Sequence, residues 1–237
     1  MLMWLSNGVL TRRPLPSVVM RSESADLTTR HAWDAVAEDY ARLVPDMSLE
    51  APLDRGVLAA FAEMLAEDKA VLVGEVGCGA GRVTKHLHDK GVRMVGFDLS
   101  PGMAAAARRL HAELPFAAAH ARALPLGDGV LGGLVAWYSL INMPTPSLAA
   151  IFVEFARVTR PGSPVLVAFQ SGDGQRVERT VSYGQPVPLT YYRHRASEVT
   201  EALTVAGFTL YASVNRGSAL AFESSPQTTL LAHRDLE

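Results

Sequence analysis

The chain has 237 residues, of which 49% are hydrophobic, and its 22 basic and 24 acidic side chains give a net charge of −2. This length fits one α/β domain with an appendage, and the apolar content is enough to bury a sizeable core. The single cysteine excludes an internal disulfide and a cysteine-based metal site, and the lack of a long basic run argues against nonspecific nucleic-acid binding.

Residues 1–25, with two prolines and several serines, are predicted to form a flexible leader, although an upstream start or a partner-docking arm are alternatives. The segment begins apolar, but Arg12 and Arg13 follow the apolar run instead of preceding it, unlike a signal peptide. No stretch approaches the ~20 apolar residues that span a bilayer. These features predict a cytoplasmic protein without a membrane span.

Two amphipathic helices are predicted next, and together they form an N-terminal helical cap over residues 26–68. Apolar side chains recur at helical spacing from near Leu27 until Pro45 ends the first helix. The second helix spans about Pro52–Glu67.

Beyond residue 70, apolar strands alternate with helical segments, which is typical of a mostly parallel sheet covered on both faces. The predicted strands are 71–76, 92–97, 116–120, 130–138, 165–170, 208–214 and 228–233. The predicted helices between them are 83–90, 101–112, 148–158 and 197–206. The polar segment 171–192, with three glycines and two prolines, is predicted to be a lid insertion, and the last two strands an antiparallel pair.

The first strand of this series runs into the most specific pattern in the chain, VLVGEVGCGAGR at residues 71–82. Three glycines at Gly77-x-Gly79-x-Gly81 let the backbone turn sharply and approach a ligand at the start of a helix. Asp98 ends the next strand, 98 − 79 = 19 residues after Gly79, close to the ~20 expected for an acid that meets a ribose hydroxyl. Because position 82 is an arginine, the loop is not G-x-G-x-x-G, and it suits an adenosine cofactor without phosphates better than a pyrophosphate.

The residues Glu75 to Gly81 resemble the first motif, D/E-x-G-C-G-x-G, of the class I S-adenosylmethionine-dependent methyltransferases, and the resemblance covers about Arg30 to the C-terminus. It implies a Rossmann-like three-layer sandwich with a seven-stranded, mostly parallel sheet whose last strand is antiparallel. It also implies S-adenosylmethionine as cofactor and a small or medium organic acceptor, as in the small-molecule branch of the family. The cofactor-binding residues predicted in this way are Glu75, Gly77, Cys78, Gly79, Gly81, Arg82, Asp98, Leu99, Met103, Ala121 and Trp137. The Cys78 side chain itself is interpreted as packing, not as a nucleophile.

Two positions depart from the family pattern. In residues 119–125, similar to G-D-A-x-x-L-P, His120 replaces the aspartate that often binds the adenine amino group, which leaves the backbone N–H of Ala121 for that ring. Arg122 beside it is expected to be exposed to solvent. Asn142 stands where several members similar to W-Y-S-L-I-H carry a candidate base, so it is expected to orient an acceptor hydroxyl or carbonyl. Tyr40, in the first helix, is expected to line the cofactor or the acceptor.

The remaining candidate residues and functions have weaker support in the sequence. His86 and His88 are two residues apart on one helix and point to different faces, so no metal site is predicted. His194 is expected at the surface of the lid. The alternative functions are a cofactor-binding protein without catalysis and a nicotinamide-dependent oxidoreductase, although the latter predicts a Tyr-x-x-x-Lys pattern that the chain lacks. The acceptor, the atom methylated and the choice between monomer and homodimer stay open.

Overall fold

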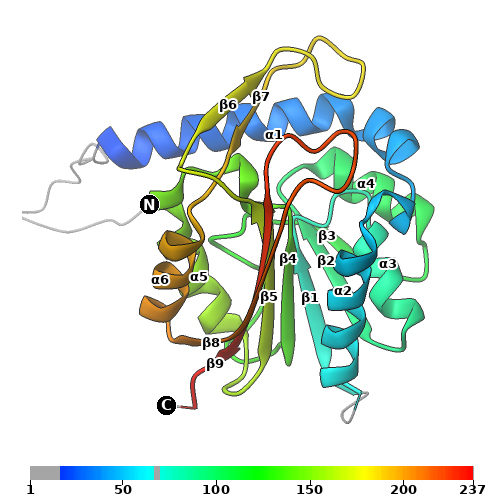
Figure 1. Cartoon of the computed structure of the whole chain (residues 1–237). Helices are drawn as coiled ribbons and strands as arrows, with labels where there is room; N and C mark the ends of the chain where they lie inside the picture. Colours follow the sequence, from blue (N-terminus) through cyan, green and yellow to red (C-terminus); the bar gives the residue numbers. More distant parts are fainter. Residues whose placement is uncertain (1–16, 67–69, 237) are drawn as a thin grey trace, which may run out of the picture.

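The computed structural model describes residues 17–66 and 70–236, which fold around one large sheet (Figure 1). The seven strands are β1 (Leu72–Val76), β2 (Arg93–Asp98), β3 (Phe116–Ala118), β4 (Gly133–Trp137), β5 (Pro164–Gln170), β8 (Phe208–Arg216) and β9 (Gln227–Arg234). Their order is β3-β2-β1-β4-β5-β9-β8. Strands β1 to β5 pair in parallel, whereas β9 runs antiparallel to both β5 and β8. The predicted seven-stranded sheet with an antiparallel last strand is confirmed.

The helices are α1 (Ser17–Leu43), α2 (Pro52–Met64), α3 (Arg82–Asp89), α4 (Pro101–Leu110), α5 (Leu148–Val158) and α6 (Ala196–Val205). Three short 3₁₀ turns are η1 (Met47–Leu49), η2 (Leu140–Asn142) and η3 (Thr145–Ser147). No helix within residues 17–66 and 70–236 has the length and apolarity to cross a bilayer.

The first helix begins at Ser17, ten residues before its predicted start near Leu27. The earlier start has a simple cause, since Pro16 is the last helix breaker and no proline or glycine occurs between it and Pro45. The first sixteen residues of the predicted leader lie outside the described part of the chain.

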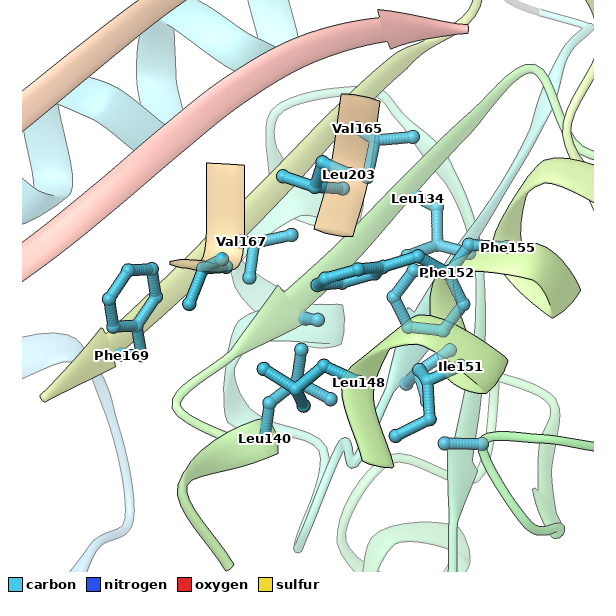
Figure 2. Packing of buried hydrophobic residues seen from close by; sticks show 14 of the residues in the cluster. Leu134, Leu140, Leu148, Ile151, Phe152, Phe155, Val165, Val167, Phe169 and Leu203 are labelled. Atoms are coloured by element: carbon cyan, nitrogen blue, oxygen red, sulfur yellow. The ribbon is translucent and has the colours of Figure 1, made fainter. Parts of the chain in front are cut away.

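The core consists of two apolar layers, one on each face of the sheet. Successive residues of a strand point to opposite faces. Leu134 and Val167 pack with Phe152 and Phe155 of α5 and with Leu203 of α6 on one face (Figure 2). Their neighbours along β4 and β5 pack on the other face with α2 and α3, in a cluster that includes Leu58, Phe61, Val83, Leu87, Val135 and Leu166.

The predicted lid, 171–192, is a β-hairpin and not an irregular loop. It contains β6 (Arg176–Arg179) and β7 (Leu189–Tyr192), which pair antiparallel. Each strand has only four residues, too few for a clear period-2 pattern in the sequence. Leu189 and Tyr191 are nevertheless buried, because one face of the hairpin packs on the body of the protein.

Helix α1 runs across the end of the sheet, with the hairpin beside it (Figure 1). Asp34 pins α1 to the start of α4, where its Oδ1 accepts hydrogen bonds from Ser100 Oγ at 2.5 Å and from the Gly102 N–H at 2.8 Å. Val36 and Ala37 pack there against Met103. Helix α1 therefore covers the carboxyl ends of the central strands like a roof.

Candidate active site

A cavity of about 530 Å³ lies under this roof. Its volume is within the range of about 300–1,000 Å³ for small-molecule sites. The segments after β1, β2, β3 and β4 form its floor, while α1, the β6–β7 hairpin and the β8–β9 loop close it. Open α/β sheets bind ligands at this edge, because the loops after parallel strands meet there.

Most of the predicted site residues meet in this cavity. Those that line it are Tyr40, Gly77, Gly79, Arg82, Asp98, Leu99, Met103, Ala121, Trp137 and Asn142. Glu75, Cys78 and Gly81 do not line it, although they belong to the same glycine loop.

Side chains would not fit at the glycines of this loop, because of their backbone conformation and their close neighbours. The φ angles of Gly77, Gly79 and Gly81 are +72°, +54° and +86°, in the left-handed region that favours glycine. A Cβ on Gly77 would lie 2.1 Å from the Cβ of Ser139, and one on Gly79 would lie 3.2 Å from Cε1 of Tyr40. The bare backbone at these positions therefore lets Ser139 and Tyr40, which also line the cavity, lie close to the loop.

Asp98 holds the glycine loop and the start of α4 together. One carboxylate oxygen accepts the Gly79 N–H and the other accepts the Ser100 N–H, both at 2.8 Å. Burial raises the pKa of Asp98 to about 6, although both N–H groups oppose this shift. The carboxylate faces the cavity, and its remaining lone pairs are suited to accept hydrogen bonds from two neighbouring hydroxyls of a sugar.

Glu75 is buried beneath the loop and not within the cavity. Its carboxylate accepts a hydrogen bond from the hydroxyl of Thr84 on α3, so it ties the end of β1 to that helix. Burial raises the pKa of Glu75 to about 8, although the Thr84 hydrogen bond and the charge of Arg82 lower it.

This raised pKa predicts a pH-dependent stability. The folded state holds the Glu75 proton more tightly than the unfolded chain, so the stabilisation is fully present below the ordinary value of 4.5 and is lost as the pH rises through about 8. Urea unfolding of the free protein should show a fall of up to about 1.4 kcal/mol per pH unit between about pH 5.5 and about pH 7.5. Glu75→Gln should flatten this slope, whereas the exposed Glu201→Gln should not. Equal slopes in the parent and in Glu75→Gln would contradict this assignment.

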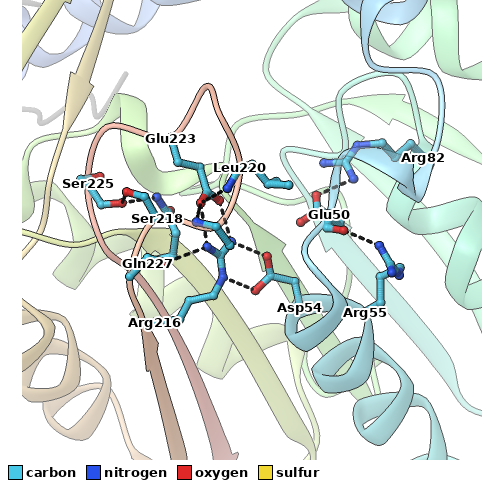
Figure 3. A network of polar contacts seen from close by, with 12 residues as sticks. Glu50, Asp54, Arg55, Arg82, Arg216, Ser218, Leu220, Glu223, Ser225 and Gln227 are labelled. Carbon is cyan, nitrogen blue, oxygen red and sulfur yellow. Dashed lines mark hydrogen bonds and ion pairs between the residues drawn. The ribbon is translucent and has the colours of Figure 1, made fainter.

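Arg82 lines the cavity, but its charge is already paired. Its guanidinium lies 2.6 Å from Glu50 Oε1, and the two side chains are only 13% and 6% exposed (Figure 3). The same guanidinium lies beside the Tyr40 hydroxyl, and burial raises the pKa of that phenol. Arg82 therefore fixes Glu50 and Tyr40 at the cavity wall.

His120 does not line the cavity, in contrast to its neighbours Ala119 and Ala121. Its Nδ1 accepts the Arg122 N–H at 2.9 Å, and its Nε2 lies 3.1 Å from an oxygen of Asp26. The prediction that Arg122 is exposed was wrong: it is half-buried and forms an ion pair with Asp26. The reason is the early start of α1, which brings Asp26 over this loop.

The Cys78 thiol points into a small apolar cluster with Ala107, Leu114 and Phe116. Burial raises the pKa of the thiol well above its usual value, which removes its nucleophilic character. The interpretation of Cys78 as a packing residue is confirmed.

Asn142 uses its amide to join three elements. Its Oδ1 accepts the Trp33 indole N–H of α1 at 3.2 Å, and its Nδ2 donates to the Thr190 carbonyl of β7 at 2.8 Å. Trp33, Tyr40 and Tyr183 stack edge-to-face or tilted, with ring centroids 5.1–5.7 Å apart. These aromatic rings form one wall of the cavity, held in place by Asn142.

His194 is fully buried, so its predicted surface position was wrong. Its ring lies between Thr145 Oγ1 at 2.9 Å and the Leu140 carbonyl at 3.2 Å. The backbones of Ser171 and His194 form an isolated β-bridge at the base of the hairpin, and this pairing places the His194 ring in the interior. Burial lowers the pKa of His194, and this residue does not line the cavity.

The sequence reasoning missed several lining residues, among them Arg179, Phe222 and Glu223. They come from segments without a motif, and only the fold brings them to the cavity. Within residues 17–66 and 70–236, no three histidine, cysteine, aspartate or glutamate side chains form a group that could hold a metal ion.

Comparison with known proteins points to one family. Residues 73–162 match the family model of a methyltransferase domain. A demethylmenaquinone methyltransferase of Beutenbergia cavernae is 34% identical over 57% of this chain and 55% of its own length, so the chain spans about half of that relative. A malonyl-[acyl-carrier protein] O-methyltransferase of Serratia marcescens is 28% identical over 72% of this chain and 71% of its own length.

The solved structures show the same fold. Magnesium protoporphyrin IX methyltransferase from Synechocystis PCC 6803, solved with bound S-adenosylhomocysteine, superposes with a TM-score of 0.66. It shares 16% identity, and the match covers 89% of this chain and 100% of that one.

Proposed function

Because the chain belongs to the class I S-adenosylmethionine-dependent methyltransferases, we propose that it transfers a methyl group from S-adenosylmethionine to a small or medium organic acceptor. The observation that carries this proposal is the meeting of Asp98 with the bare backbone of Gly77 and Gly79 at one side of the cavity. An adenosine cofactor needs both features, a carboxylate for its ribose and room against the loop.

The residues present fit this cofactor. Asp98 would accept the ribose hydroxyls, Leu99 and Met103 would flank the adenine, and the Ala121 N–H would reach its ring. The Ser139 hydroxyl lines the cavity and has no hydrogen-bond partner within the described residues, so it is free for a polar group of the ligand. When bound, S-adenosylmethionine supplies a methyl group that positively charged sulfur already activates.

The contribution of the chain is then to orient the acceptor and to exclude water. The aromatic wall formed by Trp33, Tyr40 and Tyr183 closes the cavity beside the glycine loop, where the Tyr40 ring lies next to Gly79. Holding two reactants at near-attack distance accounts for a large part of the barrier in such transfers. We assign Tyr40 to the acceptor wall and Asn142 to positioning, since the Asn142 amide fixes Trp33.

Among the described residues of the cavity wall, the tyrosines are not available as bases. Burial raises the pKa of Tyr40, Tyr183 and Tyr191, which keeps these phenols protonated at neutral pH. In-line displacement governed by positioning is therefore the proposed mechanism. The near-neutral charge argues against a nucleic-acid substrate. A cytoplasmic enzyme, monomeric or homodimeric, remains part of the proposal. We keep the proposed single domain with a helical cap and a lid.

Calorimetry with three ligands tests this proposal. We expect S-adenosylmethionine and S-adenosylhomocysteine to bind with one site per chain and NAD not to bind, because the glycine loop suits an adenosine group without a pyrophosphate. Turnover of a panel of phenols, amines and carboxylic acids then separates an enzyme from a binding protein. Binding of NAD without the sulfonium cofactor would favour the oxidoreductase alternative and reject this one.

A further inference from the structure

The β6–β7 hairpin carries a charged residue on its inward face. Cross-strand partners in an antiparallel pair point to the same side. Val177 pairs with Tyr191, and Arg179 pairs with Leu189, so these four side chains share one face. Leu189 and Tyr191 are buried, and Arg179 and Tyr191 both line the cavity. Arg179 itself is exposed, so the arginine stands where the cavity wall meets solvent, on the same face of the hairpin as two buried side chains.

The outward face of the same hairpin balances its own charges. There Arg176 pairs with Glu178 at 2.5 Å. The Arg179 guanidinium carbon instead lies 5.4 Å from the ring centroid of Tyr191, and no carboxylate forms an ion pair with it within residues 17–66 and 70–236. The aromatic ring holds the guanidinium in place without neutralising it.

The acidic groups of the cavity cannot supply the missing partner. Glu50 is paired with Arg82, and Asp98 accepts two backbone N–H groups. Glu223 is paired with Arg216 at 2.6 Å. Among the described residues that line the cavity, Arg179 is thus the cation without a carboxylate partner.

The lining of the cavity indicates the chemical character of the rest of the ligand. Apolar and aromatic side chains line the same cavity, among them Leu43, Leu49, Met143, Val181, Tyr183 and Phe222. A guanidinium presents a planar fork of donors that matches a carboxylate or a phosphate with two parallel hydrogen bonds.

We propose that Arg179 binds an anionic oxygen group, a carboxylate or a phosphate ester, on an otherwise apolar acceptor. This inference rests on the proposed function, since it names the substrate class of the same cavity. Arg179 then selects acceptors by charge, while the aromatic wall holds the apolar body.

The test uses matched ligands that differ only in charge. Binding of 2-naphthoate, 2-naphthyl phosphate and the neutral 2-naphthamide is measured by calorimetry on the full chain saturated with S-adenosylhomocysteine. Decanoate and decanamide serve as a second, aliphatic pair. We expect at least one anion to bind about tenfold or more tightly than its neutral amide. The tighter of the two naphthyl anions identifies the group as carboxylate or phosphate.

Two variants assign the preference to Arg179. Arg179→Gln should reduce the anion preference to about twofold or less, while Arg176→Gln, on the outward face of the same strand, should retain it. Both should bind S-adenosylhomocysteine like the parent, which also shows that they are folded.

Failure of this inference is distinct from failure of the proposed function. If S-adenosylhomocysteine does not bind the parent chain, the proposed function fails. If it binds and the anions show no preference or no binding, or if Arg179→Gln keeps the preference, anion recognition by Arg179 is overturned and the methyltransferase proposal stands.

Discussion

Arg216→Met is expected to lower the free energy of unfolding by about 3–5 kcal/mol. Arg216 of β8 lies 2.5 Å from Asp54 of α2 and 2.6 Å from Glu223 of the β8–β9 loop (Figure 3). The three side chains are only 9%, 4% and 7% exposed. Without the guanidinium, two buried carboxylates lose their shared partner and remain close together as uncompensated charges.

The exposed pair of Arg109 and Glu38 provides a matched control. This pair has the same two-pronged geometry, at 2.8 and 2.7 Å, but its side chains are 55% and 72% exposed. Arg109→Met should therefore leave the urea unfolding curve nearly unchanged. Adding Asp54→Asn and Glu223→Gln to Arg216→Met should recover part of the lost stability, because the uncompensated charges are removed.

The comparison of the two arginines decides the role of the network. Equal unfolding curves for Arg216→Met and Arg109→Met would show that the buried network does not stabilise the fold. A large loss for Arg216→Met alone also has a consequence for the site, because Glu223 and Phe222 line the cavity. The network then anchors the β8–β9 loop as part of the cavity wall.

The sheet and the glycine loop could be predicted because their signals are local. Strand β5, Pro164–Gln170, is buried along almost its whole length, and its sequence is a continuous apolar run. Asp98 has a fixed spacing from Gly77 and Gly79 because only helix α3 and strand β2, with their short connections, lie between them. Such features depend on neighbours in sequence, so the sequence alone determines them.

The closure of the cavity could not be predicted, because it depends on partners far apart in the chain. Asn142 meets Trp33 across 109 residues, and Arg216 meets Asp54 across 162 residues. A polar residue in a loop gives no sign of such a partner and is expected in solvent. The same assumption misplaced His194, which the fold buries under the hairpin. The sequence also gave no reason to single out Arg179, because only the pairing register places it on the same face of the hairpin as Leu189 and Tyr191.

Asp98→Asn is expected to weaken S-adenosylhomocysteine binding by about 100-fold, which corresponds to about 2.7 kcal/mol. The carboxylate now accepts the Gly79 and Ser100 N–H groups on separate oxygens and keeps lone pairs for a ribose. An amide has one acceptor oxygen, so its NH₂ group must face one of the two N–H donors or the ligand. The loss therefore affects both the shape of the loop and the sugar contact.

Calorimetry should separate this effect from a general loss of charge. Asp128→Asn removes a carboxylate that is 82% exposed, and this variant should bind S-adenosylhomocysteine like the parent. The parent should also lose affinity as the pH falls below about 6, because a protonated Asp98 carboxyl becomes a donor and loses acceptor capacity. Asp98→Asn has no carboxyl to titrate, so its weaker affinity should not follow that pH dependence. If Asp98→Asn binds like the parent, or if both lose affinity in parallel below pH 6, Asp98 is not the ribose acceptor and the cofactor must be held mainly by the backbone of the glycine loop.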